Sequence, residues 1–136
     1  MDSDLPFLIR TAKDSDRAFI ENAWRSSMLD SSPQVQGADP GAYHAEMTRL
    51  FYRLWPTATF RVACDMVAPD VLVGFVCFTG PELHYAYVSS KFRKLGLVPA
   101  MLAGLDIKRF TFKTLPGERR LKPRERTWVF TPKFTL

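Results

Sequence analysis

The sequence has few of the residues that hold metal ions or build disulfide frameworks. Its 136 residues include two cysteines, Cys64 and Cys77, and two histidines, His44 and His84. No pair among them has the spacing of metal ligands, and two thiols do not make a disulfide framework. Both cysteines lie in apolar, strand-like stretches, where a small buried side chain is their usual role. We therefore expect no metal, and a reduced, cytoplasmic setting.

A long apolar segment is also missing. The longest such run, at residues 71–78, is far shorter than the ~20 residues that a membrane-spanning helix needs. The acidic residues 1–6 do not resemble a secretory signal. Apolar residues make up 46% of the chain and charged residues 24%, which is ordinary for a globular protein. We expect one soluble domain over residues 1–136, with no membrane partner.

Acidic residues are scarce in the last third of the chain. Residues 1–90 hold 7 Lys and Arg against 11 Asp and Glu, a net charge of −4, whereas residues 91–136 hold 12 against 3, a net of +9. A basic segment of this kind suits a phosphate-rich cofactor or a nucleic acid, or else forms a solvated surface. Aromatic residues among these charges suit base stacking or, alternatively, core packing; they are Phe110, Phe112, Trp128, Phe130 and Phe134.

Hydrophobic periodicity and turn residues predict nine elements in the order β-α-α-β-β-β-α-β-β. The apolar, β-branched run at residues 71–78 is typical of a central strand buried on both faces. The order indicates an α/β (α+β) fold with a mixed central sheet flanked by helices on both sides. The predicted strands are 7–12, 57–66, 71–78, 82–88, 110–115 and 128–134, and the predicted helices are 14–28, 40–55 and 98–107.

The segment 91–98 follows a predicted strand and opens a predicted helix. Unpaired backbone N–H groups and the helix dipole concentrate positive charge at such a position. Gly96 lets the backbone approach a ligand closely, since it has no Cβ. Lys91, Arg93 and Lys94 add full charges. The segment therefore predicts an anion site suited to a pyrophosphate.

The run Arg93-Lys94-Leu95-Gly96-Leu97-Val98 resembles the coenzyme A motif of the GNAT superfamily of N-acetyltransferases, Gln/Arg-x-x-Gly-x-Gly/Ala. The element order matches that family over residues 7–115. The resemblance implies a GNAT-like fold with acetyl-CoA (coenzyme A) as cofactor, and the motif as its pyrophosphate site. It also implies that Tyr87 and Val88 bind the cofactor, and that the backbone of Val88 pairs with the pantetheine arm and helps polarise the thioester carbonyl.

The chain departs from the family pattern in three places. Val98 stands where the motif has a small residue, no tyrosine follows the motif to protonate the leaving thiolate, and the C-terminus is shortened. The run from His84 to Val88, followed by Phe92 and Arg93, is also similar to small phage-encoded members. More distantly, it resembles the phage Mom DNA-modification proteins. These resemblances imply a host-cytoplasmic setting for a phage-encoded protein.

Two residues of the strand 82–88 are candidates for the general base. Glu82 lies eleven positions before Arg93, the spacing at which histone-type lysine acetyltransferases of this family carry their base. Period-two alternation places Glu82, His84, Ala86 and Val88 on one face, so His84 is a second candidate. The alternatives are a solvated strand-start residue for Glu82 and a structural or substrate-lining histidine for His84.

The leading interpretation is an N-acyltransferase that moves an acyl group, acetyl by analogy, from acetyl-CoA to an amine in a ternary complex, with Glu82 as base. The acceptor is then an amine on a small molecule or a protein. The first alternative is a Mom-like protein that binds or modifies DNA through its basic C-terminal third. The second is a degenerate GNAT fold kept for interaction or structure. The sequence leaves open the acceptor and whether the protein is a homodimer.

Overall fold

The computed structural model describes residues 6–31, 40–111 and 129–130. The order of helices and strands agrees with the prediction, with two short 3-10 helices, η2 and η3, added. In chain order the elements are β1 (Phe7–Thr11), η2 (Asp14–Asp16), α1 (Arg17–Ser31), α2 (Pro40–Leu54), β2 (Thr59–Asp65), β3 (Leu72–Thr79), β4 (Glu82–Val88), η3 (Ser90–Phe92), α3 (Leu97–Met101), β5 (Arg109–Phe110) and β6 (Val129–Phe130).

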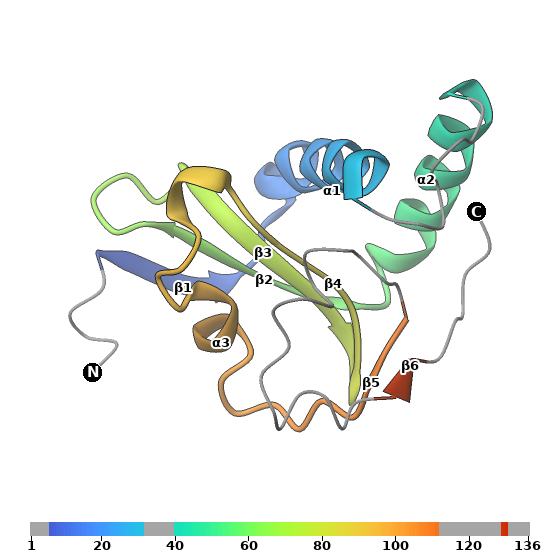
Figure 1. Cartoon of the computed structure of the whole chain (residues 1–136). Coiled ribbons are helices and arrows are strands. Elements are labelled where there is room, and N and C mark those ends of the chain that lie inside the picture. The colour runs from blue at the N-terminus through green and yellow to red at the C-terminus, as the bar shows by residue number, and fades with distance from the viewer. Residues whose placement is uncertain (1–5, 32–39, 112–128, 131–136) are drawn as a thin grey trace.

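One six-stranded sheet runs in the order β1-β2-β3-β4-β5-β6. The first four strands form an antiparallel meander, and β5 then joins parallel to β4 after the crossover through α3. The last pair, β5 and β6, is also parallel. Figure 1 shows α1 and α2 on one side of the sheet and α3 on the other, which confirms the predicted mixed sheet with helices on both faces.

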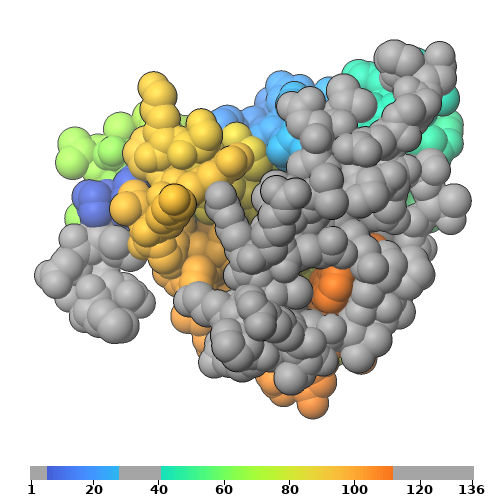
Figure 2. Space-filling view, in the orientation of Figure 1, coloured from blue at the N-terminus to red at the C-terminus, as the bar shows by residue number. Residues whose placement is uncertain are grey.

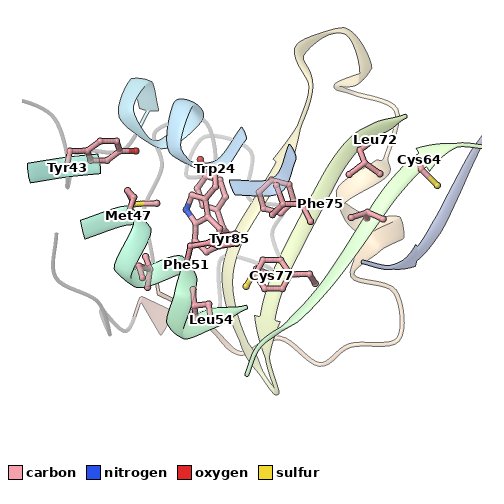
Figure 3. Close-up of a cluster of buried hydrophobic side chains, with 14 residues drawn as sticks. Trp24, Tyr43, Met47, Phe51, Leu54, Cys64, Leu72, Phe75, Cys77 and Tyr85 are labelled. Atoms are coloured by element: carbon pink, nitrogen blue, oxygen red, sulfur yellow. The ribbon is translucent and has the colours of Figure 1, made fainter. Parts of the chain in front are cut away.

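The face covered by α1 and α2 carries the larger, aromatic core. Trp24 of α1 stacks on Tyr85 of β4 with ring centroids 5.0 Å apart and planes 3° apart, and it also contacts Phe75 of β3. Apolar residues of α2 recur every three or four positions and fill the same layer, as Figure 3 shows. Every residue of β3 except its last is buried, so the prediction of a strand covered on both faces is confirmed.

A second cluster lies beneath α3. Leu97 and Met101 of this helix are buried against strand residues that include Val76 and Val88. Arg61 of β2 fixes the end of the helix, because its Nη1 donates to the carbonyls of Met101 and Ala103, at 3.1 Å each. The sheet therefore holds α3, and with it the segment between β4 and α3, in a set position.

The predicted helix 98–107 is wrong in length, because α3 has five residues, Leu97–Met101. After Met101 the chain continues in turns, and Gly104 takes a left-handed conformation with φ of 81° that a helix does not contain. The bonds from Arg61 occupy carbonyls that a longer helix would pair internally. A tertiary contact thus ends the helix before its apolar pattern ends.

Only parts of the last two predicted strands fall on described residues. The strand predicted for 110–115 overlaps β5 at Phe110 alone, because β5 begins one residue earlier and Thr111 lies beyond its end, and β6 falls within the strand predicted for 128–134. Residues 112–128 and 131–136, with most of the basic C-terminal segment, lie outside the described residues. None of the helices in the described ranges is long and apolar enough to cross a bilayer.

Candidate functional site

An irregularity in β4 decides which way its side chains point. Cys77 of β3 pairs with Tyr85, yet the next residue, Phe78, pairs with Leu83. Two steps on β4 therefore match one step on β3, which is the geometry of a β-bulge, and His84 is the extra residue.

The bulge overturns the prediction that alternation holds along the whole strand. Leu83 packs in the cluster beneath α3 together with Ala86 and Val88, whereas Tyr85 packs against α1. The neighbour of Leu83, Glu82, consequently lies on the side of the strand opposite to Ala86. The single face predicted for Glu82, His84, Ala86 and Val88 is therefore wrong, because the extra residue reverses the alternation.

Glu82 begins β4 in a partly buried ion pair. Its side chain is 10% exposed, and its Oε2 accepts a hydrogen bond from Nε of Arg109 at 3.1 Å. The pair forms because β5 runs parallel to β4 here, with Glu82 opposite Arg109. Glu82 is thus not the solvated strand-start residue of the alternative interpretation. It is a carboxylate held in place by a cation.

His84 joins three segments of the chain. Its Nε2 is 2.8 Å from Oγ1 of Thr79, at the end of β3, and its Nδ1 is 2.9 Å from Oγ1 of Thr111, just after β5. The residue is 3% exposed. Both ring nitrogens are engaged, which favours the structural alternative for His84 over a role as base.

Two of the last three residues of β4, Ala86 and Val88, present backbone groups on the side away from β3. The amide of Ser89 donates to the carbonyl of Val73 on β3 at 2.8 Å. Because backbone groups alternate along a strand, Tyr87 also faces β3, while Ala86 and Val88 direct their N–H groups the other way. In the described part of the chain, the pairing with β5 ends at Leu83. The two amides thus point at an edge along which the described chain places no strand.

The segment after β4 turns back toward the strand through Arg93. Its Nε donates to the carbonyl of Val88 at 3.0 Å. Lys94 has a φ of 69° and Gly96 a φ of 77°, two left-handed residues that fold the segment tightly before α3. Lys91, Arg93 and Lys94 are all exposed. Figure 2 shows the segment as part of the gold region at the surface.

The residues predicted to bind the cofactor differ in what they can offer a ligand. Leu97 is buried in the cluster beneath α3 and Val98 packs against it, so these two offer backbone groups rather than side chains. Tyr87 is half-buried and packs against the ring of Phe75. Leu95 is 45% exposed. A helix of five residues also has a smaller dipole than the predicted longer one. The charge of this segment therefore comes mainly from its side chains.

Arg109, Thr79 and Thr111 are site residues that the sequence did not reveal. They become partners of Glu82 and His84 only through the parallel pairing of β4 with β5 and through the bulge. The one available signal was the position of Glu82 at the start of a predicted strand, because a carboxylate that becomes buried there needs a cation or donor nearby. Phe110 packs against the cluster beneath α3, which favours core packing over base stacking for this aromatic.

Comparison with protein-family models and with curated proteins finds no match for this sequence. Solved structures do match. An archaeal protein of Pyrococcus furiosus assigned as an acetyl transferase superposes with a TM-score of 0.59 at 17% identity, over 96% of this chain and 83% of the other. A GNAT-superfamily phosphinothricin acetyltransferase of Sinorhizobium meliloti, solved with acetyl-CoA, gives 0.54 at 21% identity, over 74% and 58%. The chain has the GNAT fold.

The apo form of YjaB from Escherichia coli also superposes on this chain, with a TM-score of 0.53 at 21% identity over 73% of this chain. This chain spans 66% of the length of YjaB and 58% of the Sinorhizobium enzyme. The fold predicted from the order of elements and from the segment 93–98 is therefore confirmed.

Proposed function

We propose that the protein is an N-acyltransferase that uses acetyl-CoA. The observation that carries the proposal is the outward-facing backbone at the end of β4, beside the basic segment 91–98, in a GNAT fold. An extended pantetheine arm contains amide groups, and an open strand edge is a natural partner for them. In this scheme the exposed cations of Lys91, Arg93 and Lys94 bind the phosphates.

Acetyl-CoA supplies an activated acyl group as a thioester. The amine nitrogen attacks the carbonyl carbon, negative charge develops on the carbonyl oxygen, and the carbon–sulfur bond breaks to release the thiolate. The N–H groups of Ala86 and Val88 are the donors that suit this developing charge, since they are fixed by the ladder with β3. Donors held in place before the reaction need no reorganisation during it.

Glu82 is the proposed general base. Glu82 lies four positions before Ala86, about 13 Å along an extended strand, so the proton passes from the amine to the carboxylate through water. The contact with Arg109 fixes the carboxylate but also competes for one of its oxygens. His84, held by two threonines, supports the bulge and is not assigned a proton-transfer step.

Isothermal titration calorimetry with acetyl-CoA tests the proposal at its first step. We expect saturable binding of acetyl-CoA at one site. Desulfo-coenzyme A should compete for this site if the pantetheine arm contributes to binding. Turnover against a panel of primary amines then tests the second step. Absence of binding at millimolar acetyl-CoA contradicts the proposal. Binding without turnover on any amine favours the degenerate fold kept for interaction.

A further inference from the structure

Strand β1 forms an edge of the sheet whose outer side meets no described strand. Toward β2, the Ala12 amide donates to the Phe60 carbonyl at 2.9 Å, and the Pro6 carbonyl accepts from the Met66 amide at 3.2 Å. Because backbone groups alternate along a strand, every second residue between Pro6 and Ala12 directs its N–H and C=O groups away from the sheet. The outward-facing residues are Phe7, Ile9 and Thr11.

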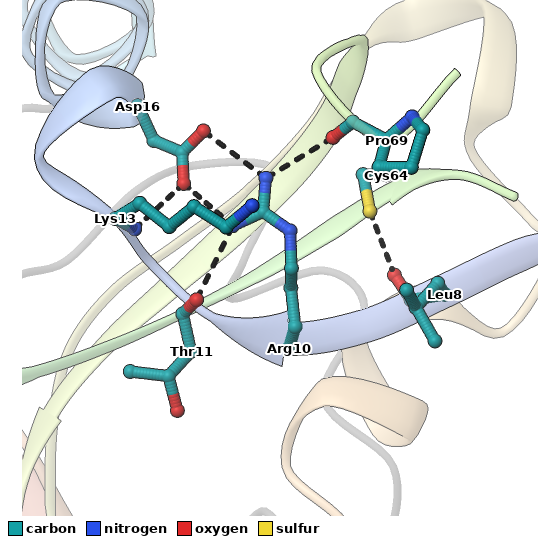
Figure 4. A network of polar contacts seen from close by, with 7 residues as sticks. All are labelled: Leu8, Arg10, Thr11, Lys13, Asp16, Cys64 and Pro69. Carbon is teal, nitrogen blue, oxygen red and sulfur yellow. Dashed lines mark hydrogen bonds and ion pairs between the residues drawn. The ribbon is translucent and has the colours of Figure 1, made fainter.

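This edge lacks the features by which proteins usually prevent edge strands from pairing. It contains no proline, its register with β2 is regular, and its one charged residue is Arg10. The guanidinium of Arg10 is turned back into its own chain, where Nη1 and Nη2 contact the two carboxylate oxygens of Asp16 at 2.6 and 3.1 Å. Nη2 also donates to the carbonyl of Pro69 at 3.1 Å, as Figure 4 shows.

Both members of the Arg10–Asp16 ion pair stay charged at neutral pH. Burial of Asp16 opposes its ionisation, but hydrogen bonds from Arg10 and from the Lys13 amide outweigh that effect and lower the pKa of Asp16. The hydrogen bond to Asp16 is also the main reason that the pKa of Arg10 is raised. The edge of β1 consequently presents no free charge that would repel an approaching strand.

Apolar side chains are exposed on and next to the edge strand β1. Leu8, on the side of β1 opposite to Phe7 and Ile9, is 43% exposed. The turn between β2 and β3 lies next to the start of β1, since the Met66 amide reaches the Pro6 carbonyl. In that turn Met66 is 52% exposed and Val67 is 93% exposed. Apolar surface of this kind, beside an unpaired edge, is typical of an interaction surface.

We propose that a second copy of the chain pairs with this edge, β1 against β1, about a twofold axis at Ile9. The outward groups of Ile9 then bond to those of Ile9 in the second copy, and Phe7 exchanges hydrogen bonds with Thr11. The Thr11 carbonyl already accepts from Arg10 Nη1 at 3.2 Å and has a second lone pair for this bond.

A second copy fits better than an unrelated strand for two reasons. An antiparallel edge is self-complementary under a twofold axis, and the outward residues are symmetric about Ile9, one on either side at equal spacing. In the same register, Leu8 lies beside Arg10 of the second copy. The guanidinium of that Arg10 is neutralised by its own Asp16, so its aliphatic stem can cover Leu8. The paired strands are about 17 Å long, so we expect a reversible dimer whose population rises with concentration.

Sedimentation velocity over a range of protein concentrations tests the dimer without reference to the proposed acyl transfer. The mass is expected to rise from that of one chain to that of two. Leu8→Lys places an exposed cation on the edge and is expected to weaken the dimer about tenfold. Ala18→Lys, the same charge on an exposed position of α1, is the control and leaves the dimer unchanged. A monomer at every concentration, or a dimer insensitive to Leu8→Lys, overturns the proposal.

Cysteine cross-linking tests the register. Residues directly opposite in a hydrogen-bonded pair have Cα atoms about 5.5 Å apart, within the range of a disulfide, so Ile9→Cys is expected to form a covalent dimer on mild oxidation. Leu8→Cys in the two copies is diagonal, roughly 7–8 Å apart, and is expected to stay monomeric in denaturing gels. Cys64 and Cys77 are buried and do not interfere. Cross-linking by Leu8→Cys instead of Ile9→Cys overturns this register.

Discussion

The two halves of β4 differ in which of their groups form hydrogen bonds within the protein. In the first half, the side chains of Glu82 and His84 are buried and bound to Arg109, Thr79 and Thr111. In the second half, Ala86 and Val88 have plain apolar side chains but direct their amides away from the sheet. The side chains of the first half thus bond within the protein, while the amides of Ala86 and Val88 in the second half lie along an edge where the described chain places no strand.

The largest effect is expected where β3 supports the second half of β4. A Cβ added to Gly74 would lie 2.6 Å from the carbonyl oxygen of Tyr87 and 3.2 Å from the side chain of Val88. Gly74→Ala must therefore displace β4, and we expect it to lower the free energy of unfolding in urea by about 3 kcal/mol. It should also abolish acetyl-CoA binding.

A matched control for Gly74→Ala is Gly104→Ala. A Cβ at Gly104 meets nothing within 4 Å, and only its φ of 81° opposes the change. The expected cost is about 1 kcal/mol, from backbone strain alone. Equal losses for the two variants would show that the close approach at Gly74 does not hold β4 in position.

The second-largest effect is expected at Glu82, in the first half of β4. Two variants distinguish a catalytic role of this residue from a structural one. If Glu82 takes the proton, Glu82→Gln lowers kcat about 100-fold and leaves the KM for acetyl-CoA unchanged. Arg109→Ala removes the same ion pair but keeps the carboxylate, so it should lower kcat much less. Steady-state rates on an accepted amine measure both. Similar losses in the two variants would assign Glu82 to structure.

His84 is expected to matter for stability. His84→Leu removes the partner of two threonine hydroxyls, and we expect the free energy of unfolding to fall by about 2 kcal/mol in urea denaturation. His44→Leu changes the same residue type at an exposed position of α2 and should stay within about 0.5 kcal/mol of the unchanged protein. A His84→Leu variant as stable as His44→Leu would contradict the structural role.

The smallest effect is expected at the segment after β4. Arg93→Ala removes both the charge and the hydrogen bond to the Val88 carbonyl, so calorimetry should show acetyl-CoA binding weakened about tenfold. Arg93→Lys keeps the charge and loses the Nε donor, which isolates the contribution of the bond. Lys91→Ala is the control for general charge. If Lys91→Ala and Arg93→Ala weaken binding equally, Arg93 contributes charge alone.

Local patterns predicted most of the elements. The apolar run of β3, the proline that starts α2 and the bounds Glu82–Val88 of β4 were all found from residue order, because periodicity and turn chemistry act over a few neighbours. The GNAT fold followed from their order together with the run from Arg93 to Val98. The length of α3 was missed because Arg61, forty residues away, takes its last carbonyls.

The sequence by itself thus determined the fold, the basic segment after β4 and the identity of the residues worth testing. The tertiary structure decided what those residues contact. It set Glu82 against Arg109 and His84 between two threonines, and it turned the amides of Ala86 and Val88 outward. The physical reason is that a bulge and a parallel strand pairing depend on partners distant in the chain, which no local pattern around β4 contains.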